Sequence, residues 1–417
     1  MAIRANVSEG HVAITGHADR GKFNSEFLTY ENTLVLRAFA VILIIFAHVQ
    51  YWAGFYFSNM ASIMVGLFFF LSGYGLTISK ITKPDYLTTF NRRRWSSVVI
   101  PTVTTSVLGF CIYVLYGAGN TGNMHAILYR IFINPISGFI YQLLVFYIIF
   151  YISNRFFKEK DALVLIWAGS ILLLVAKLFG HNLDYNHENS FLFAIGATVA
   201  VYNDALYGII SRNYNKVLLL IGGLFFLACV NFSMDVRYDS TYNFVTTAAV
   251  LFLILLIMKK PEHSYRTFAL IFFILVVMYW LWYWFWPNIN IGGLNIMRDI
   301  FLIACISSVL NCSSGNLRKI SDTIGSSTLE MYLIHWSLFP VVWPITSGMG
   351  SLMPILTTLL MLVFTLSIAI PMHYLNSYQV DGHKRLAKMI WKSYDVSILY
   401  VVTVLVILFH YVMINIL

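Results

Sequence analysis

The chain has 417 residues, of which 59% are hydrophobic and 11% charged, and its formal net charge at pH 7 is +9. Apolar runs of membrane-spanning length recur from residue 33 to the C-terminus, and no soluble domain of ordinary size fits between them. This composition excludes a soluble globular enzyme and predicts an all-α protein, a polytopic transmembrane helical bundle.

The predicted spans follow one another with short connections. Their ranges are 33–52, 60–80, 96–116, 137–154, 161–179, 190–203, 215–232, 241–258, 266–286, 297–312, 326–345, 354–376 and 395–416. Every second connection is rich in Lys and Arg, and the others are rich in Asn, Tyr and Gly. Because basic residues accumulate in cytoplasmic loops, the alternation predicts a multi-pass inner-membrane protein with a cytoplasmic N-terminus. It also accounts for the positive charge without a nucleic-acid partner.

The first predicted span, LVLRAFAVILIIFAHVQYW, contains Arg37 and His48. Charged and titratable side chains are costly inside a bilayer and usually mark function. Eleven helical positions make about three turns with about 20° left over, so both side chains share one face, about 16 Å apart along the axis. Such a helix could bind an anion at one depth and transfer protons at another. Alternatively, Arg37 reaches the cytoplasmic headgroups and His48 the opposite interface.

The second and third spans carry small and basic residues. In GLFFFLSGYGL, Ser72 and Gly73 let a neighbouring backbone or a thin ligand approach closely, although helix packing alone would also use them. The third span is entered through Arg92, Arg93 and Arg94. Guanidinium groups bind phosphate in bidentate fashion, so this cluster is either a phosphate clamp or a topological anchor.

Polar residues also occur later in the chain. His187 and Glu188 precede the sixth span and could line an external mouth for a polar acceptor, or belong to a solvated loop. The eleventh span, within IGSSTLEMYLIHWSL, contains Glu330, Tyr332 and His335. Glu330 and His335 diverge by about 140° on a regular helix, so they should face different neighbours. We expect Glu330 near the cytoplasmic interface, and His335 deeper, as a participant in chemistry or as a structural histidine.

The four cysteines lie in apolar spans and lack metal-ligand spacing. They are therefore interpreted as small packing residues, and we expect no metal site.

In this order, the motifs resemble those of the acyltransferase-3 family of integral membrane acyltransferases, which includes bacterial O-acetyltransferases of surface polysaccharides. Arg37 and His48 match the family's Arg-x10-His signature, and FFFLSGYGL is similar to FFxLSGF. FNRRRWSSVVIP resembles the basic entry to the third span, ENSFLFAIGATVAVY a Phe-x-x-x-Gly segment, and STLEMYLIHWSL a Ser-x-Glu-Ile-Tyr-Leu-Ile-His segment. Arg94 matches the first arginine of an Arg-x-x-Arg element, but Ser97 stands at the second, so Arg92 or Arg93 could replace it.

The resemblance implies a core of about ten helices with additional spans. It implies transfer of an acyl group, most often acetyl, from cytoplasmic acetyl-CoA to a hydroxyl of an envelope glycan or glycolipid, with His48 catalytic and Arg37 binding the donor. We also expect His335 to be catalytic. The other expected donor contacts are Arg92, Arg93, Arg94, Ser72 and Gly73, and the expected acceptor contacts are Glu188, Glu330 and Tyr332.

We accordingly divide the chain into four parts. They are a polar cytoplasmic N-terminal segment (1–32), the membrane acyltransferase core (33–376), a basic cytoplasmic linker (377–394) and an additional C-terminal transmembrane helix (395–417). Two other functions stay open from sequence. One is a transporter or flippase with Arg37 and His48 lining its pathway, and the other is a noncatalytic acyl-CoA binder. The sequence does not predict an oligomeric state.

Overall fold

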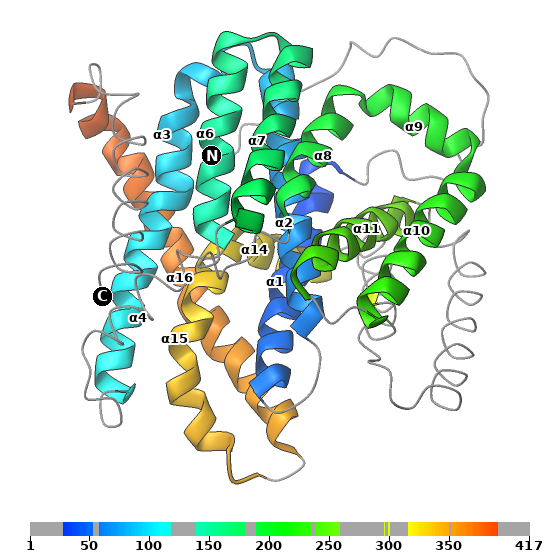
Figure 1. Ribbon diagram of the computed structural model, residues 1–417. Coiled ribbons are helices and arrows are strands. Elements are labelled where there is room, and N and C mark those ends of the chain that lie inside the picture. The colour runs from blue at the N-terminus through cyan, green and yellow to red at the C-terminus, as the bar shows by residue number, and fades with distance from the viewer. Residues whose placement is uncertain are drawn as a thin grey trace, which may run out of the picture.

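The computed structural model describes residues 28–52, 58–117, 139–179, 189–234, 238–258, 296, 299–300, 316–349 and 352–390. All regular structure in these residues is helical, which confirms the predicted all-α class. Figure 1 shows the helices, with α8 to α11 grouped on one side of the molecule. The predicted spans at 266–286 and 395–416, like most of 297–312, lie outside the described residues.

The helical elements keep close to the predicted spans. Their bounds are α1 Tyr30–Trp52, α2 Ser58–Thr82, η1 Leu87–Thr89, α3 Phe90–Arg94, η2 Trp95–Val99, α4 Ile100–Gly117, α6 Tyr141–Phe156, α7 Glu159–Phe179, α8 Ser190–Val201, α9 Asn203–Arg212, α10 Tyr214–Met234, α11 Tyr238–Met258, α14 Asn316–Ser326, α15 Thr328–Thr346 and α16 Met353–Ile390. The segment 377–390, predicted as a linker, continues the backbone of α16. The division into four parts stays a prediction.

Four described helical stretches are long and apolar enough to cross a membrane: Tyr30–Tyr51, Met60–Thr82, Leu87–Ile112 and Met353–Asn376. A fifth crossing results if Phe191–Val201 and Asn203–Arg212 form one broken span, since the two are bent by 91°. Because several such helices occur in one chain, the protein is a multi-pass membrane protein. The ten-helix core remains a prediction.

The bend after α8 falls where the apolar sequence stops. Polar residues Asn203 and Asp204 open α9, and none of the α9 residues is buried. The predicted span at 190–203 is therefore a 12-residue helix that ends at Val201. Twelve residues are too few to cross a bilayer of ordinary thickness as a single α-helix.

Helices α2 and α8 pack closely through glycines. A Cβ atom at Gly73 would collide with the carbonyl oxygen of Phe193, and one at Gly196 would collide with the carbonyl oxygen of Phe70. Small residues at these points let the two backbones touch, as is common between membrane helices. The contact holds α2 in place, and α2 supplies one wall of the cavity described below.

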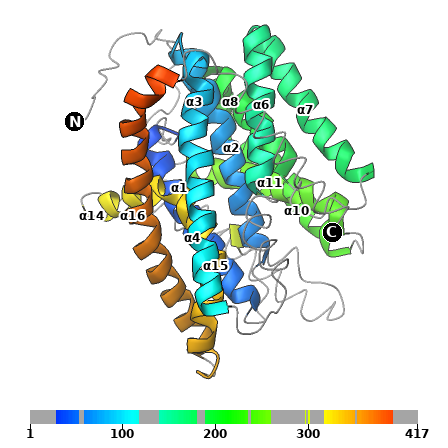
Figure 2. The same cartoon turned by 90° about the vertical axis from the view of Figure 1, so that its left-hand side faces the viewer.

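Helix α15 lies against α1, α4 and α16 (Figures 1 and 2). Helix α14 precedes it and crosses the start of α1, where Arg318 donates a 3.1 Å hydrogen bond from Nη1 to Oδ1 of Asn32. Gly325 of α14 packs directly on the carbonyl group of Leu34. These contacts bring the beginning of α15 close to the beginning of α1, although about 300 residues separate them in sequence.

Candidate active site

A cavity of about 580 Å³ lies between the first helices and the last ones in the described part of the chain. Its walls come from α1, α2, α6, α14, α15 and α16 and from the segment that joins α3 to α4. Its volume falls in the usual range for a small-molecule site. The lining is partly apolar and partly polar, with hydroxyl groups of serine, threonine and tyrosine beside a few charged side chains.

The positive charge of the cavity comes from Arg37 and Arg94, which are near enough to interact electrostatically. The guanidinium of Arg94 lies over the ring of Tyr147, with Cζ 5.4 Å from the centroid, and 5.8 Å from the centroid of Phe90. Its Nε is buried and has no hydrogen-bond partner in the described structure. No carboxylate there forms an ion pair with either arginine. Because buried donors are costly when unpaired, an anion in the cavity would stabilise this arrangement.

The other predicted donor contacts occupy different places. Ser72 lines the cavity, whereas Gly73 faces α8. Arg93 is exposed and lies over the ring of Tyr86, and neither it nor Arg92 borders the cavity. Ser97 does border it.

Tyr86 is a cavity residue that the sequence did not suggest. Burial raises the pKa of the Tyr86 phenol, and the neighbouring Arg94 lowers it in part. The phenol is therefore neutral at pH 7 and can donate a hydrogen bond to a bound anion.

His48 of α1 and His335 of α15 lie side by side. Nδ1 of His48 is 3.0 Å from Nε2 of His335, and the two ring planes differ by only 4°. Nδ1 of His335 is in turn 2.6 Å from the carbonyl oxygen of Tyr332. Sequence analysis marked both histidines, but their contact depends on the packing of α1 against α15 and could not be read from spacing.

The histidine pair adjoins the cavity without forming part of its wall. Tyr332 lines the cavity, and His335 follows one helical turn later, buried. Arg37 therefore lines the cavity, whereas His48, expected on the same face of the helix, contacts His335 behind Tyr332.

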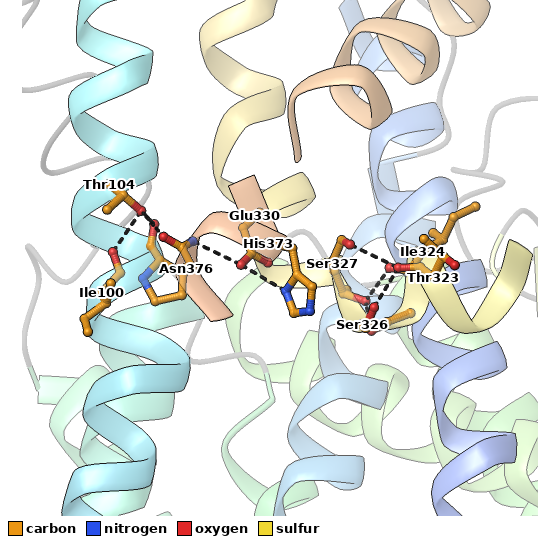
Figure 3. A network of polar contacts seen from close by, with 12 residues as sticks. Ile100, Thr104, Thr323, Ile324, Ser326, Ser327, Glu330, His373 and Asn376 are labelled. Atoms are coloured by element: carbon orange, nitrogen blue, oxygen red, sulfur yellow. Dashed lines mark hydrogen bonds and ion pairs between the residues drawn. The ribbon is translucent and has the colours of Figure 1, made fainter. Parts of the chain in front are cut away.

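Glu330 belongs to a second polar cluster in the cavity wall, which Figure 3 shows. Its Oε1 accepts a hydrogen bond from Nδ2 of Asn376 at 3.2 Å and lies 3.2 Å from Nδ1 of His373. Thr104 of α4 lies 3.1 Å from Oδ1 of Asn376, within hydrogen-bond distance. Glu330 and His335 do face different neighbours. Glu330 is only 2% exposed and lines the cavity, and its expected place near the cytoplasmic interface stays a prediction.

His373 and Asn376 were not suggested by the sequence, in which they lie at the end of the predicted span 354–376. A signal was nevertheless present, since the two polar residues are three positions apart and therefore close on one helix face. Glu188, the remaining predicted acceptor contact, lies outside the described residues. In the part of the chain that the structure describes, no group of three His, Cys, Asp or Glu side chains is placed to hold a metal ion.

Comparison with known proteins assigns the chain to a family. The sequence model of the acyltransferase-3 family, described as an acyltransferase domain, matches residues 35–267, more than half of the chain. The chain belongs to the acyltransferase-3 family. No curated protein and no solved structure matches this acyltransferase. The matched region includes Arg37, His48 and Arg94 but ends before α14. Glu330 and His335 lie outside it, and only the fold brings them close to the matched residues.

Proposed function

We propose that this membrane acyltransferase moves an acetyl group from cytoplasmic acetyl-CoA to a hydroxyl of an envelope glycan or glycolipid, in the inner membrane. The observation that carries the proposal is the His48–His335 pair directly behind a cavity with two guanidinium groups. A base next to an anion site suits a reaction in which a phosphate-bearing donor meets a hydroxyl acceptor.

Arg37 and Arg94 bind the phosphates of the donor. The unpaired Nε of Arg94 supplies a hydrogen bond that no described residue takes, and phosphate oxygens accept such bonds from arginine in bidentate fashion. Ser72 and Tyr86 add hydroxyl donors on the same wall. Arg92 and Arg93 stand outside this wall, so their contribution is to attract the anionic donor from a distance.

The chemical step is direct transfer. Neutral His48 accepts the proton of the acceptor hydroxyl while the hydroxyl oxygen attacks the thioester carbonyl carbon. The new C–O bond forms and the C–S bond breaks, and the CoA thiolate takes the proton from the imidazolium. His335 supports His48, and Tyr332, which lines the cavity, stabilises the oxyanion or contacts the acceptor through its hydroxyl.

Glu330 is the candidate contact for the acceptor. Its Oε1 is already engaged by Asn376 and His373, which orients the carboxylate in the wall. A carboxylate held in this way can accept hydrogen bonds from sugar hydroxyl groups. Glu188 is a further candidate, placed on sequence grounds alone.

The test compares cells that carry the wild-type gene, no gene or His48→Ala. We expect mass spectrometry of the envelope glycans to find an added acetyl group only with the wild-type protein, because His48→Ala removes the base. With purified protein, the release of free CoA thiol measures the hydrolysis of acetyl-CoA or the transfer of its acetyl group. Unchanged acetylation by a well-folded His48→Ala variant would exclude His48 as the general base. Solute transport without CoA release would indicate a transporter.

A further inference from the structure

We propose that His335 is a positioning residue that fixes the tautomer of His48, with the proton on Nδ1 and the basic lone pair on Nε2. This inference rests on the proposed function, because it concerns the base of the acyl transfer. Beyond that function, the inference identifies the nitrogen of His48 that accepts the proton and the side chain that sets the tautomer.

The carbonyl oxygen of Tyr332 fixes the tautomer of His335. A carbonyl can only accept a hydrogen bond, so Nδ1 of His335, 2.6 Å away, carries a proton. In a neutral imidazole the other nitrogen is then an acceptor. Nε2 of His335 therefore presents a lone pair to His48.

The lone pair on Nε2 of His335 fixes the tautomer of His48. Nδ1 of His48 lies 3.0 Å from that lone pair, so Nδ1 of His48 must be the donor. Neutral His48 with a proton on Nδ1 has its lone pair on Nε2. In the described part of the chain the only hydrogen bond of the His48 ring is at Nδ1, so the lone pair on Nε2 is left to accept a proton.

The ring geometry is compatible with this hydrogen bond. Ring N–H bonds and ring lone pairs both lie in the plane of the imidazole, and two nearly coplanar rings with facing nitrogens can place them in line. The planes of His48 and His335 differ by 4°. Trp336 packs against the ring of His48 at a centroid distance of 4.7 Å, which restrains its rotation.

The relay also helps in the charged state of the reaction. When Nε2 of His48 takes the proton, the Nδ1–H donates a charge-assisted hydrogen bond to His335, which is stronger than the neutral one. His335 thus acts as the carboxylate does in the catalytic triad of a serine hydrolase. It orients the base without touching the substrate. A neutral partner is the less costly choice at a buried position.

The first experiment uses two variants of full-length, purified protein. The side-chain oxygen of Gln can lie where Nε2 of His335 lies, so His335→Gln keeps an acceptor for His48, whereas His335→Leu removes it. We expect His335→Leu to lower kcat by about 10²- to 10⁴-fold, the usual range for loss of a well-oriented base, with the KM for acetyl-CoA unchanged. His335→Gln should keep kcat within about 10-fold of the wild type.

Two outcomes of this experiment would overturn the inference. If His335→Leu and the wild type have the same kcat, His335 does not position the base. If His335→Gln is as inactive as His335→Leu while His48→Gln retains activity, the roles are reversed and His335 is the base. Wild-type protein without transfer activity on any acceptor would instead refute the proposed function itself.

A second measurement needs neither variant and remains decisive if His335→Leu does not fold. Nitrogen-15 NMR of histidine-labelled wild-type protein in lipid distinguishes a protonated ring nitrogen from one with a lone pair. We expect the histidine signals that are lost in His48→Gln to show a neutral ring with the proton on Nδ1. A proton on Nε2 of His48 would overturn the inference.

Discussion

At the residue scale, the most unusual side chain in the cavity wall is Arg94. It is held by the rings of Tyr147 and Phe90, and no carboxylate among the described residues pairs with it. Aromatic faces attract a guanidinium and fix its plane without neutralising its charge. The positive charge is thereby left for a ligand.

Arg94→Gln tests this role. We expect the KM for acetyl-CoA to rise by about 10- to 100-fold, because charge-assisted hydrogen bonds contribute about 1.5–3 kcal/mol each. The kcat at saturating donor should change much less, because the reacting atoms lie elsewhere. Steady-state kinetics with purified protein measures both constants.

Arg93→Gln is the matched control, since Arg93 is the neighbouring arginine but is exposed and outside the cavity. Its substitution should leave the KM within about 3-fold of the wild type, as for an exposed surface charge. Equal effects of the two substitutions would contradict a specific phosphate contact at Arg94.

The sequence draws attention to polar residues that interrupt the first and eleventh predicted spans, although it did not do so for His373 and Asn376 in the span 354–376. Arg37, His48, Glu330, Tyr332 and His335 all stand out on that basis, because burial of polar groups in a bilayer is costly. What the sequence could not show is which of them meet. The His48–His335 contact joins residues 287 positions apart, and only tertiary packing creates it.

At the element scale, the α2–α8 contact depends on backbone approach at Gly73 and Gly196. The second-span motif had two readings, a ligand approach or helix packing. For Gly73 the structure shows the packing contact, and for Ser72 it shows the cavity. Sequence alone could not separate two adjacent residues that differ by about 100° in direction.

Gly73→Ala should destabilise the protein because the added methyl group meets the backbone of α8, which cannot move aside as a side chain can. We expect a loss of about 1–3 kcal/mol or more, seen as a lower unfolding temperature in detergent. Gly75→Ala is the control on the same helix, since nothing lies within 4 Å of its added Cβ. Equal unfolding temperatures for Gly73→Ala and the wild type would be inconsistent with this contact.

The polar cluster around Glu330 ties α15 to α16 and, through Asn376 and Thr104, to α4. Glu330→Leu would leave the donors of Asn376 and His373 unpaired in a buried wall, at a cost of about 1–3 kcal/mol. Glu330→Gln keeps an acceptor oxygen, so it should be closer to the wild type in thermal unfolding. If Leu is tolerated as well as Gln, the cluster contributes nothing to the packing of these helices.

At the scale of the whole molecule, the charge pattern predicts which side of the membrane each connection occupies. The connection between α6 and α7 carries Lys158, which is exposed, and a nearby ion pair joins Lys80 of α2 to Glu159 of α7 at 3.1 Å. Two basic connections of the sequence therefore lie close together, and their cytoplasmic placement stays a prediction.

Cysteine labelling tests this orientation in a background without the native cysteines. Lys158→Cys should react with an impermeant maleimide only after the cells are opened, whereas Asn186→Cys, in a connection predicted to be external, should react in intact cells. Labelling of Lys158→Cys in intact cells would show that the predicted orientation is inverted.

Helix α16 has a consequence for the shape of the cavity. Its 38 residues correspond to about 57 Å, more than the roughly 40–45 Å of a whole bilayer with its headgroups. Pro371 lies inside this helix and removes the backbone hydrogen bond to residue 367, so the helix is weakest there. His373 and Asn376 follow Pro371 within the membrane-crossing stretch Met353–Asn376, and both line the cavity. The direction that α16 takes after this proline therefore sets the position of two cavity residues.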